Sequence, residues 1–123
     1  MFAARNKGML FERRAENFLR RQGLKLLRRN FYCRFGEIDL IMQDGDTLCF
    51  VEVKYRRSGA FGGAAWSLPR SKQRRVVAAA AVYLQRRRGG EPPTRFDALL
   101  IQQQPDGGDR FDWIQGAFDA SAL

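Results

Sequence analysis

The chain has 123 residues, of which 45% are hydrophobic, and this suits one domain with a modest core. Lys and Arg total 22 against 13 Asp and Glu, so the net charge is +9, which favours a polyanionic partner. Histidine is absent, which excludes triads with a histidine base, histidine-ligated metals and nucleases with a histidine general base. Any catalysis would therefore use carboxylates, lysine and a metal ion.

The sequence predicts neither a zinc cage nor a membrane span. Cys33 and Cys49 lack the paired short spacings of a zinc or redox site, so we expect buried reduced thiols. The longest uncharged apolar stretch, 76–84, is too short to cross a bilayer. We therefore expect a cytoplasmic protein that binds nucleic acid rather than a membrane.

The apolar periodicity predicts seven elements in the order α-β-β-β-α-β-β. Gly23 follows the first helix as a C-terminal glycine, and Asp44-Gly45 is a strong hairpin signal. The glycine-rich stretch 56–69 predicts a long loop, after which Ser71 offers an N-cap. The expected elements are a helix over 8–22, strands over 24–33, 37–42 and 48–55, a helix from 71 to about 88, and strands over 96–102 and 110–118.

Acidic residues face one another across the predicted hairpin. A loop of two or four residues centred on Asp44-Gly45 would pair Asp39 with Phe50 and Glu37 with Glu52. Asp39 and Glu52 would then lie diagonally on one face, about 7 Å apart. Two carboxylates at this separation can coordinate one cation.

Side chains alternate across a strand, so each predicted strand has a charged face and an apolar face. The charged face is expected to hold Glu37, Asp39, Glu52 and Lys54, and the apolar face Ile38, Leu40, Val51, Val53 and Tyr55. Mg²⁺ prefers carboxylate oxygens and binds through one or two of them plus a phosphate. Lys54 can orient or deprotonate a metal-bound water and offset phosphate charge. The pattern predicts a hydrolytic site for phosphodiesters.

Two plainer interpretations remain open. Glu52 and Lys54 could form an ordinary ion pair on a sheet face that meets solvent. Glu12 has a like charge, Glu16, at i+4, so no intrahelical cation explains its position. A carboxylate in the first turn of a helix is stabilised by the helix dipole, and this explanation of Glu12 is favoured from the residues alone.

Five blocks of sequence resemble the YraN family of small bacterial proteins, and the resemblance covers almost the whole chain. They are Gly8–Ala15, Arg29–Phe31, Gly36–Ile41, Phe50–Lys54 and Arg95–Asp97. The resemblance implies a predicted endonuclease with the restriction-endonuclease-like fold, akin to archaeal Holliday junction resolvases and the PD-(D/E)xK nucleases. It implies that Asp39 is the aspartate of that motif and that Glu52 and Lys54 are its E-x-K pair. Glu12 would be the extra glutamate of the first helix, and Ile38 stands where the motif's name has proline.

Basic residues near the loop that follows Lys54 are the preferred contacts for a nucleic-acid backbone. These are Arg56, Arg57, Lys72, Arg74 and Arg75. For any one of them a solvated face is the alternative. The chain has no base-reading motif such as a zinc finger or an RNP-type strand, so we expect recognition by backbone and shape.

Together these observations predict one nuclease-like α/β domain over 1–123, with a mixed central sheet flanked by helices. We expect it to hydrolyse DNA, including branched or structured DNA, with Mg²⁺ or Mn²⁺ bound by Asp39 and Glu52. The alternatives are a non-catalytic nucleic-acid-binding protein on the same fold and an RNA-processing nuclease. A homodimer is a further expectation. Its apolar patch, which could equally close the core, would comprise Phe111, Trp113, Ile114 and Phe118.

Overall fold

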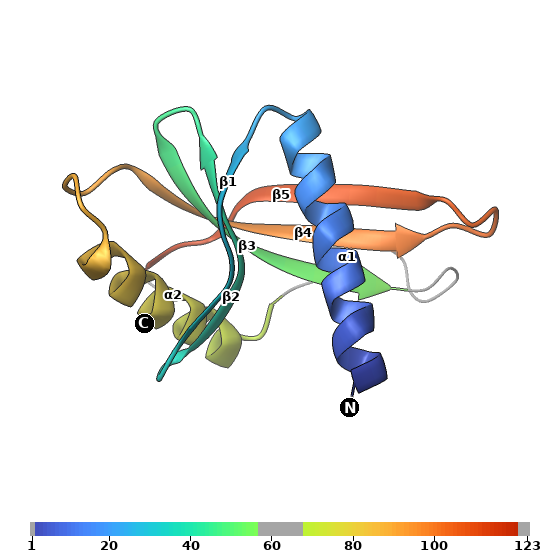
Figure 1. Cartoon of the computed structure of the whole chain (residues 1–123), viewed down its shortest axis with the longest axis horizontal. Coiled ribbons are helices and arrows are strands. Elements are labelled where there is room, and N and C mark those ends of the chain that lie inside the picture. The colour runs from blue at the N-terminus through green and yellow to red at the C-terminus, as the bar shows by residue number, and fades with distance from the viewer. Residues whose placement is uncertain (1, 57–67, 121–123) are drawn as a thin grey trace.

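Seven elements follow one another in the computed structural model, which describes residues 2–56 and 68–120 and, for residues 2–8, the backbone alone. They are α1 (Phe2–Arg21), β1 (Lys25–Cys33), β2 (Gly36–Asp44), β3 (Thr47–Arg56), α2 (Arg70–Arg86), β4 (Thr94–Gln103) and β5 (Asp109–Phe118). The predicted order α-β-β-β-α-β-β is confirmed, and so is the mixed sheet between helices (Figure 1).

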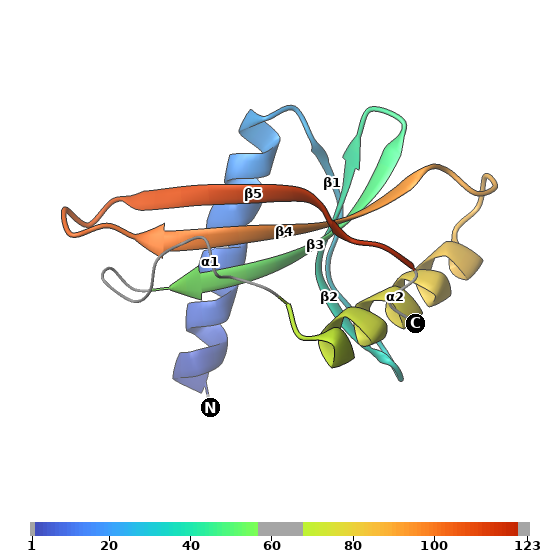
Figure 2. The ribbon, with the colours of Figure 1, turned by 180° about the vertical axis from the view of Figure 1, so that it is seen from behind.

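The strands form one sheet in the order β1-β2-β3-β4-β5. β3 and β4 are parallel, and every other neighbouring pair is antiparallel. A parallel pair needs a crossover connection, and α2 lies in the connection between β3 and β4. α1 lies in front of the sheet in Figure 1 and behind it in Figure 2, whereas α2 comes forward in Figure 2. The two helices therefore cover opposite faces of the sheet.

Each helix packs on its own hydrophobic cluster. In the strand β3, Phe50 belongs to the cluster under α2, which includes Val76 and Ala80, and Val51 belongs to the cluster under α1, which includes Leu19. Because both faces of β3 are covered, its residues Leu48 to Val51 are all buried. The central strands are therefore apolar on both faces, which leaves little room for a charged side chain without a partner.

The ends of the helices follow local chemistry. α1 begins at Phe2, earlier than predicted, and ends at Arg21. Gly23 follows it as expected, with a φ of +99°, and Leu24 N donates to Leu19 O. The predicted N-cap of α2 is wrong. Pro69 occupies that position, with φ −56° and ψ 146° and no side-chain cap, and Ser71 lies inside the helix. Neither described helix is long and apolar enough to span a membrane.

The β2–β3 turn contains Gly45 and Asp46, since Asp44 pairs with Thr47. Gly45 has a φ of +59° at the first turn position, as a type II′ turn requires. The predicted pairing of Asp39 with Phe50 is therefore wrong by two residues, because the turn begins one residue later than assumed. A shift of two residues keeps side chains on their faces, and Leu40, Val51, Val53 and Tyr55 share the face under α1 as predicted. The prediction is wrong for Ile38, which packs in the cluster under α2, so the alternation along β2 breaks between Ile38 and Leu40.

Most of the C-terminal aromatic residues close the core. Phe111 stacks on Phe18 with ring centroids 4.6 Å apart, and Trp113 meets the same ring edge-on. Phe118 stacks on Phe96 at 5.0 Å. Of the expected dimer patch, only Ile114 is well exposed, at 40% of its surface.

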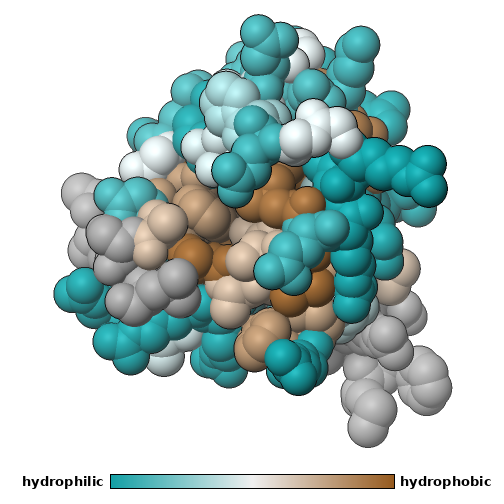
Figure 3. All heavy atoms as spheres, turned by 90° about the vertical axis from the view of Figure 1, so that its left-hand side faces the viewer, coloured by the Kyte–Doolittle hydropathy of each residue, from teal (hydrophilic) through white to brown (hydrophobic). Residues whose placement is uncertain are grey.

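Apolar surface also remains at the end of the molecule near α2. Figure 3 views this end and shows apolar side chains gathered between polar ones. A hollow of about 680 Å³ lies between α2 and the β1–β2 turn, and its lining includes Cys33, Phe35 and Val82. Cys33 is partly exposed and Cys49 is buried, and both are free thiols, so the expectation of burial is confirmed for Cys49 alone.

Candidate functional site

The backbone pairing between β2 and β3 ends next to Asp39. Backbone pairing of β2 with β3 runs from Asp44 only as far as Leu40, and the same register places Asp39 opposite Glu52. There the carboxylates replace carbonyl groups as acceptors. Val53 N donates to Asp39 Oδ2 at 2.8 Å, and Asp39 N donates to Glu52 Oε2 at 3.2 Å. Asp39 and Glu52 are thus held side by side, as predicted, although opposite rather than diagonal to each other.

The other neighbour of Asp39 is also irregular. In β1, Arg29 and Phe31 pair with β2 while Asn30 between them does not. Asn30 has a φ of +50°, a left-handed conformation that Asn tolerates better than most residues. Its side chain hydrogen-bonds Glu12 of α1. Sequence reasoning missed Asn30, and a turn-favouring residue inside a strand-like stretch was the available signal.

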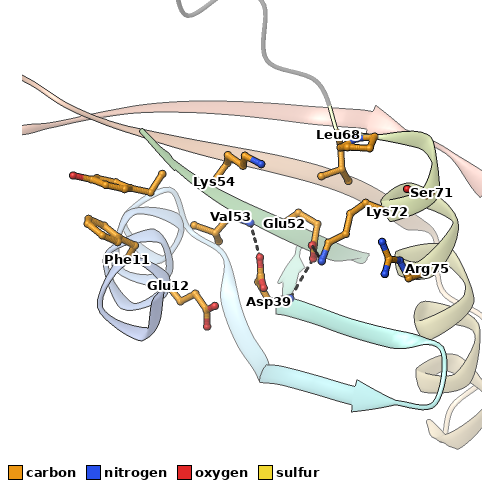
Figure 4. Close-up of a pocket in the computed structure, with 12 residues that line it drawn as sticks. Phe11, Glu12, Asp39, Glu52, Val53, Lys54, Leu68, Ser71, Lys72 and Arg75 are labelled. Carbon is orange, nitrogen blue, oxygen red and sulfur yellow. Dashed lines mark hydrogen bonds and ion pairs between the residues drawn. The ribbon is translucent and has the colours of Figure 1, made fainter. Parts of the chain in front are cut away.

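Glu12 approaches the pair from α1, as Figure 4 shows. The pKa of Glu12 is raised to about 7, chiefly by burial and then by the charges of Asp39 and Glu37, whereas the hydrogen bond from Asn30 opposes the shift. The helix-dipole explanation is wrong, because α1 begins at Phe2 and Glu12 lies well inside the helix. Glu12 is therefore better explained by the acidic cluster it joins.

The carboxylates of Asp39 and Glu52 lie in surroundings that disfavour their charged forms. Burial is the first cause that raises the pKa values of both Asp39 and Glu52 above the ordinary range, and the charge of Asp39 adds to the effect on Glu52. Hydrogen bonds from backbone amides and the charge of Lys72 oppose the shift. A divalent cation would relieve this repulsion. The hard oxygen donors of the pair fit Mg²⁺ or Mn²⁺, which bind through one or two carboxylates and fill their remaining positions with water or phosphate oxygens.

Within residues 9–56 and 68–120, no group of three or more His, Cys, Asp or Glu side chains is arranged to hold a metal ion. The candidate metal site therefore consists of the two carboxylates of Asp39 and Glu52, with Glu12 beside them.

A cavity of about 470 Å³ opens over these residues between α1, β3 and α2. Its lining combines the acidic Glu12, Asp39 and Glu52 with the basic Lys54, Lys72 and Arg75. Phe11 and Tyr55 close one side, stacked with ring centroids 3.6 Å apart. The cavity thus places carboxylates at its floor and cations at its rim, as a site for a metal ion and a phosphate requires.

The cation nearest to the pair is not the one that the strand pattern suggested. Lys72 Nζ lies 3.5 Å from Glu52 Oε1, and Figure 4 shows Lys72 reaching Glu52 from α2. Lys54 is exposed and lines the cavity without an ion pair to any described residue. Glu52 is only 3% exposed, so an ordinary Glu52–Lys54 pair on a wet face does not describe this strand.

The other preferred basic residues are spread more widely. Arg75 lines the cavity with Lys72, one helical turn further along α2. Arg74 is exposed on α2 outside the cavity lining, and Arg56 ends β3. Arg57 lies outside the described residues. The structure thus brings Lys72 and Arg75 to the site, and contact of each of these residues with nucleic acid stays a prediction.

Other arginines serve the fold. Glu16 is buried and paired with Arg29, whose Nε lies 2.6 Å from Oε1, so this contact ties α1 to β1. Arg95 binds the fully buried Asp97, with Nε 2.9 Å from Oδ1. Asp97 also accepts hydrogen bonds from Trp113 Nε1 and Gly116 N, and it thereby fixes β5 beside β4. The charges of these arginines are therefore balanced by buried carboxylates of the same chain.

Comparison with known proteins places the chain in a family. The model of the family described as "Uncharacterised protein family UPF0102" matches residues 11–101, which include Glu12, Asp39, Glu52 and Lys54. A UPF0102 protein of Nitrosomonas eutropha is 50% identical over 119 residues, covering 97% of this chain and 98% of its own. A UPF0102 protein of Psychromonas ingrahamii is 48% identical over 116 residues, covering 94% and 92%. The chain therefore belongs to the UPF0102 family, the YraN family that its motifs resemble.

Proposed function

We propose that the protein is a metal-dependent endonuclease that hydrolyses phosphodiester bonds in DNA, including branched or structured DNA. One observation carries this proposal: Asp39 and Glu52 lie side by side where the sheet opens, on the floor of a cavity with a basic rim. Buried carboxylates that repel each other are typical of functional sites. The net charge of +9 suits a phosphate-rich substrate.

Each residue has a role in this proposal. Asp39 and Glu52 would hold Mg²⁺ or Mn²⁺, which supplies a Lewis acid and lowers the pKa of a bound water. Lys54 lines the same cavity and would take a proton from the attacking water or offset phosphate charge. Glu12, with a pKa of about 7, can hold or release a proton near neutral pH and would assist at the leaving or attacking oxygen.

Cleavage assays test the activity. Labelled duplex, flap, four-way-junction and single-stranded DNA, together with RNA, should be incubated with the protein and Mg²⁺ or Mn²⁺. We expect cleavage of DNA that Glu52→Gln abolishes, because glutamine keeps an acceptor for Asp39 N but binds a cation poorly. Glu91→Gln, at an exposed carboxylate, is the matched control.

The outcomes of these assays separate the alternatives. Binding without cleavage under both metals would support the non-catalytic nucleic-acid-binding protein. Preferential cleavage of RNA would support the RNA-processing nuclease.

Calorimetric titration tests the metal site separately from activity. We expect Mn²⁺ to bind the wild-type protein and not the Asp39→Asn, Glu52→Gln double variant. Binding that persists unchanged in the double variant would place the metal elsewhere and remove this mechanism.

A homodimer is part of the proposal, because a symmetric four-way junction presents two strands and a two-fold dimer presents two sites. The aromatic residues expected at the interface pack largely within the chain, so Ile114 is the remaining candidate of that patch. Sedimentation with and without four-way-junction DNA decides the point. A monomer under both conditions would exclude paired cleavage by a stable dimer and favour flaps or single strands as substrates.

A further inference from the structure

We propose that Lys72 exchanges partners during binding: it neutralises Glu52 while no divalent cation is present, and it contacts a DNA phosphate once a cation has displaced it. This inference rests on the proposed function, because it assumes that Asp39 and Glu52 bind the cation. It assigns to the first turn of α2 a role that couples metal binding to substrate binding.

The two oxygens of Glu52 have different partners. Oε2 accepts the hydrogen bond from Asp39 N at 3.2 Å, which fastens β2 to β3. Oε1 faces Lys72 Nζ at 3.5 Å. Because Oε2 is engaged by the backbone, Oε1 is the oxygen that a cation would use without disturbing the sheet. Lys72 and a divalent cation therefore compete for the same atom, and their charges repel each other at such short range.

Lys72 is able to leave Glu52 without movement of its helix. Its side chain is 34% exposed, and a lysine ammonium group sits on a flexible four-carbon stem. The helix itself is held by Val76 and Val77, which are buried against the sheet. The exchange thus needs a change of side-chain rotamer only.

A displaced Lys72 side chain would lie in the cavity, where few carboxylates would be available to pair with it. The first turn of α2 contains no acidic residue, and Arg75 on the same helix adds a second cation to the lining. The carboxylates of Asp39 and Glu52 would already be engaged by the metal ion. A phosphate that enters the cavity is then the natural partner of the released ammonium group.

Calorimetric titration with Ca²⁺ in mildly alkaline buffer tests the competition for Glu52. We expect Lys72→Met to bind Ca²⁺ several-fold more tightly than the wild type, because no side-chain cation then has to be displaced. Arg75→Met is the matched control, since it removes a charge from the same lining without an ion pair to Glu52. It should change Ca²⁺ affinity less. Unchanged or weaker Ca²⁺ binding by Lys72→Met would overturn the inference.

The affinity for duplex DNA, measured by fluorescence anisotropy at several salt concentrations, tests the second partner. In Ca²⁺, Lys72→Met should lower the log–log salt slope by about 0.9, the value for one phosphate contact. In EDTA it should leave the slope unchanged, because Glu52 then holds Lys72. Arg75→Met should change the salt slope by the same amount in both buffers.

An equal loss of slope for Lys72→Met in Ca²⁺ and in EDTA would overturn the exchange. A different result would contradict the proposed function itself: wild-type protein that does not bind Ca²⁺ through Asp39 and Glu52. Thermal melting confirms that each variant is folded.

Discussion

The guanidinium group of Arg29 donates two hydrogen bonds to the carboxylate of Glu16: Nε lies 2.6 Å from Oε1 and Nη2 lies 3.1 Å from Oε2. Glu16 is buried and lies about one helical turn from Glu12 on the same face of α1. The contact joins α1 to β1, the strand that also holds Asn30. The position of Glu12 over Asp39 therefore depends on an ion pair outside the cavity.

Glu16→Gln should lower the free energy of unfolding by about 1–3 kcal/mol, because it removes charge-assisted hydrogen bonds from a buried acceptor. Arg20→Gln is the matched control. Arg20 pairs with the same carboxylate but is 54% exposed, so its loss should cost about 0.5 kcal/mol or less. Urea denaturation measures both, and equal losses would contradict this account of the contact.

Glu12 predicts a dependence of stability on pH. Its pKa is about 7 in the folded protein against 4.5 for an ordinary glutamate, so the folded state binds the proton more tightly than the unfolded chain. The contribution of Glu12 to the free energy of unfolding should therefore fall as pH rises from about 4.5 through 7. The raised pKa values of Asp39 and Glu52 act in the same direction.

Over this interval Glu12→Gln should gain stability relative to the wild type, as measured by urea denaturation at a series of pH values. Glu91→Gln, which alters an exposed carboxylate, should follow the wild type throughout. A constant difference between wild type and Glu12→Gln would show that Glu12 titrates alike in the folded and unfolded states.

Asp97→Asn should be the more damaging of two aspartate substitutions in β4 and β5. Asp97 is fully buried and accepts four hydrogen bonds, two from Arg95 and one each from Trp113 and Gly116. Loss of its charge should cost about 3–5 kcal/mol, since Arg95 loses its buried counterion and keeps its ion pair with the more exposed Asp44. Asp112→Asn breaks a partly exposed pair with Arg110 and should cost less than about 1 kcal/mol. Thermal melting followed by tryptophan fluorescence would reject the prediction if both variants melted alike.

Gly36→Ala should destabilise the β1–β2 turn more than Gly45→Ala destabilises the β2–β3 turn. Gly36 has a φ of +148°, and an added Cβ would lie 3.3 Å from Arg75 Cβ. Gly45 also has a positive φ, of +59°, but its Cβ would meet nothing within 4 Å. We expect a loss of about 1–3 kcal/mol at Gly36, from strain and contact together, against about 1 kcal/mol at Gly45. Equal losses in the free energy of unfolding, measured by urea denaturation, would contradict the prediction and mean that α2 moves at Arg75 to make room for the added methyl group.

The elements of the fold could be predicted because they follow from local sequence. Alternation of side chains fixed the shared face of Asp39 and Glu52, and this survives any even shift of register. The register itself depended on which residue takes the positive φ in the turn, and the turn residues Asp44 to Asp46 fit more than one choice. The early residues of α1 have no apolar period, so the periodicity placed its start too late.

The site was predicted in part. A motif within two neighbouring strands identified Asp39 and Glu52, since residues close in sequence keep a fixed relation across a hairpin. The contact of Lys72 with Glu52 joins a helix to a strand across the crossover, and no local pattern records that distance. The same is true of Asn30, which meets Glu12 only after α1 has packed on the sheet.

The hydrogen bonds that bridge β2 and β3 make two backbone amides sensitive to the chemistry of the cavity. Val53 N–H and Asp39 N–H end on carboxylates that would also bind a cation, whereas amides elsewhere in the ladder end on carbonyls, which do not titrate. Protonation or metal coordination would draw electron density from these acceptors and shift the two amide resonances in a nitrogen–proton correlation spectrum. These two amide resonances would therefore report whether Asp39 and Glu52 are charged, without a substrate and without a label on the side chains.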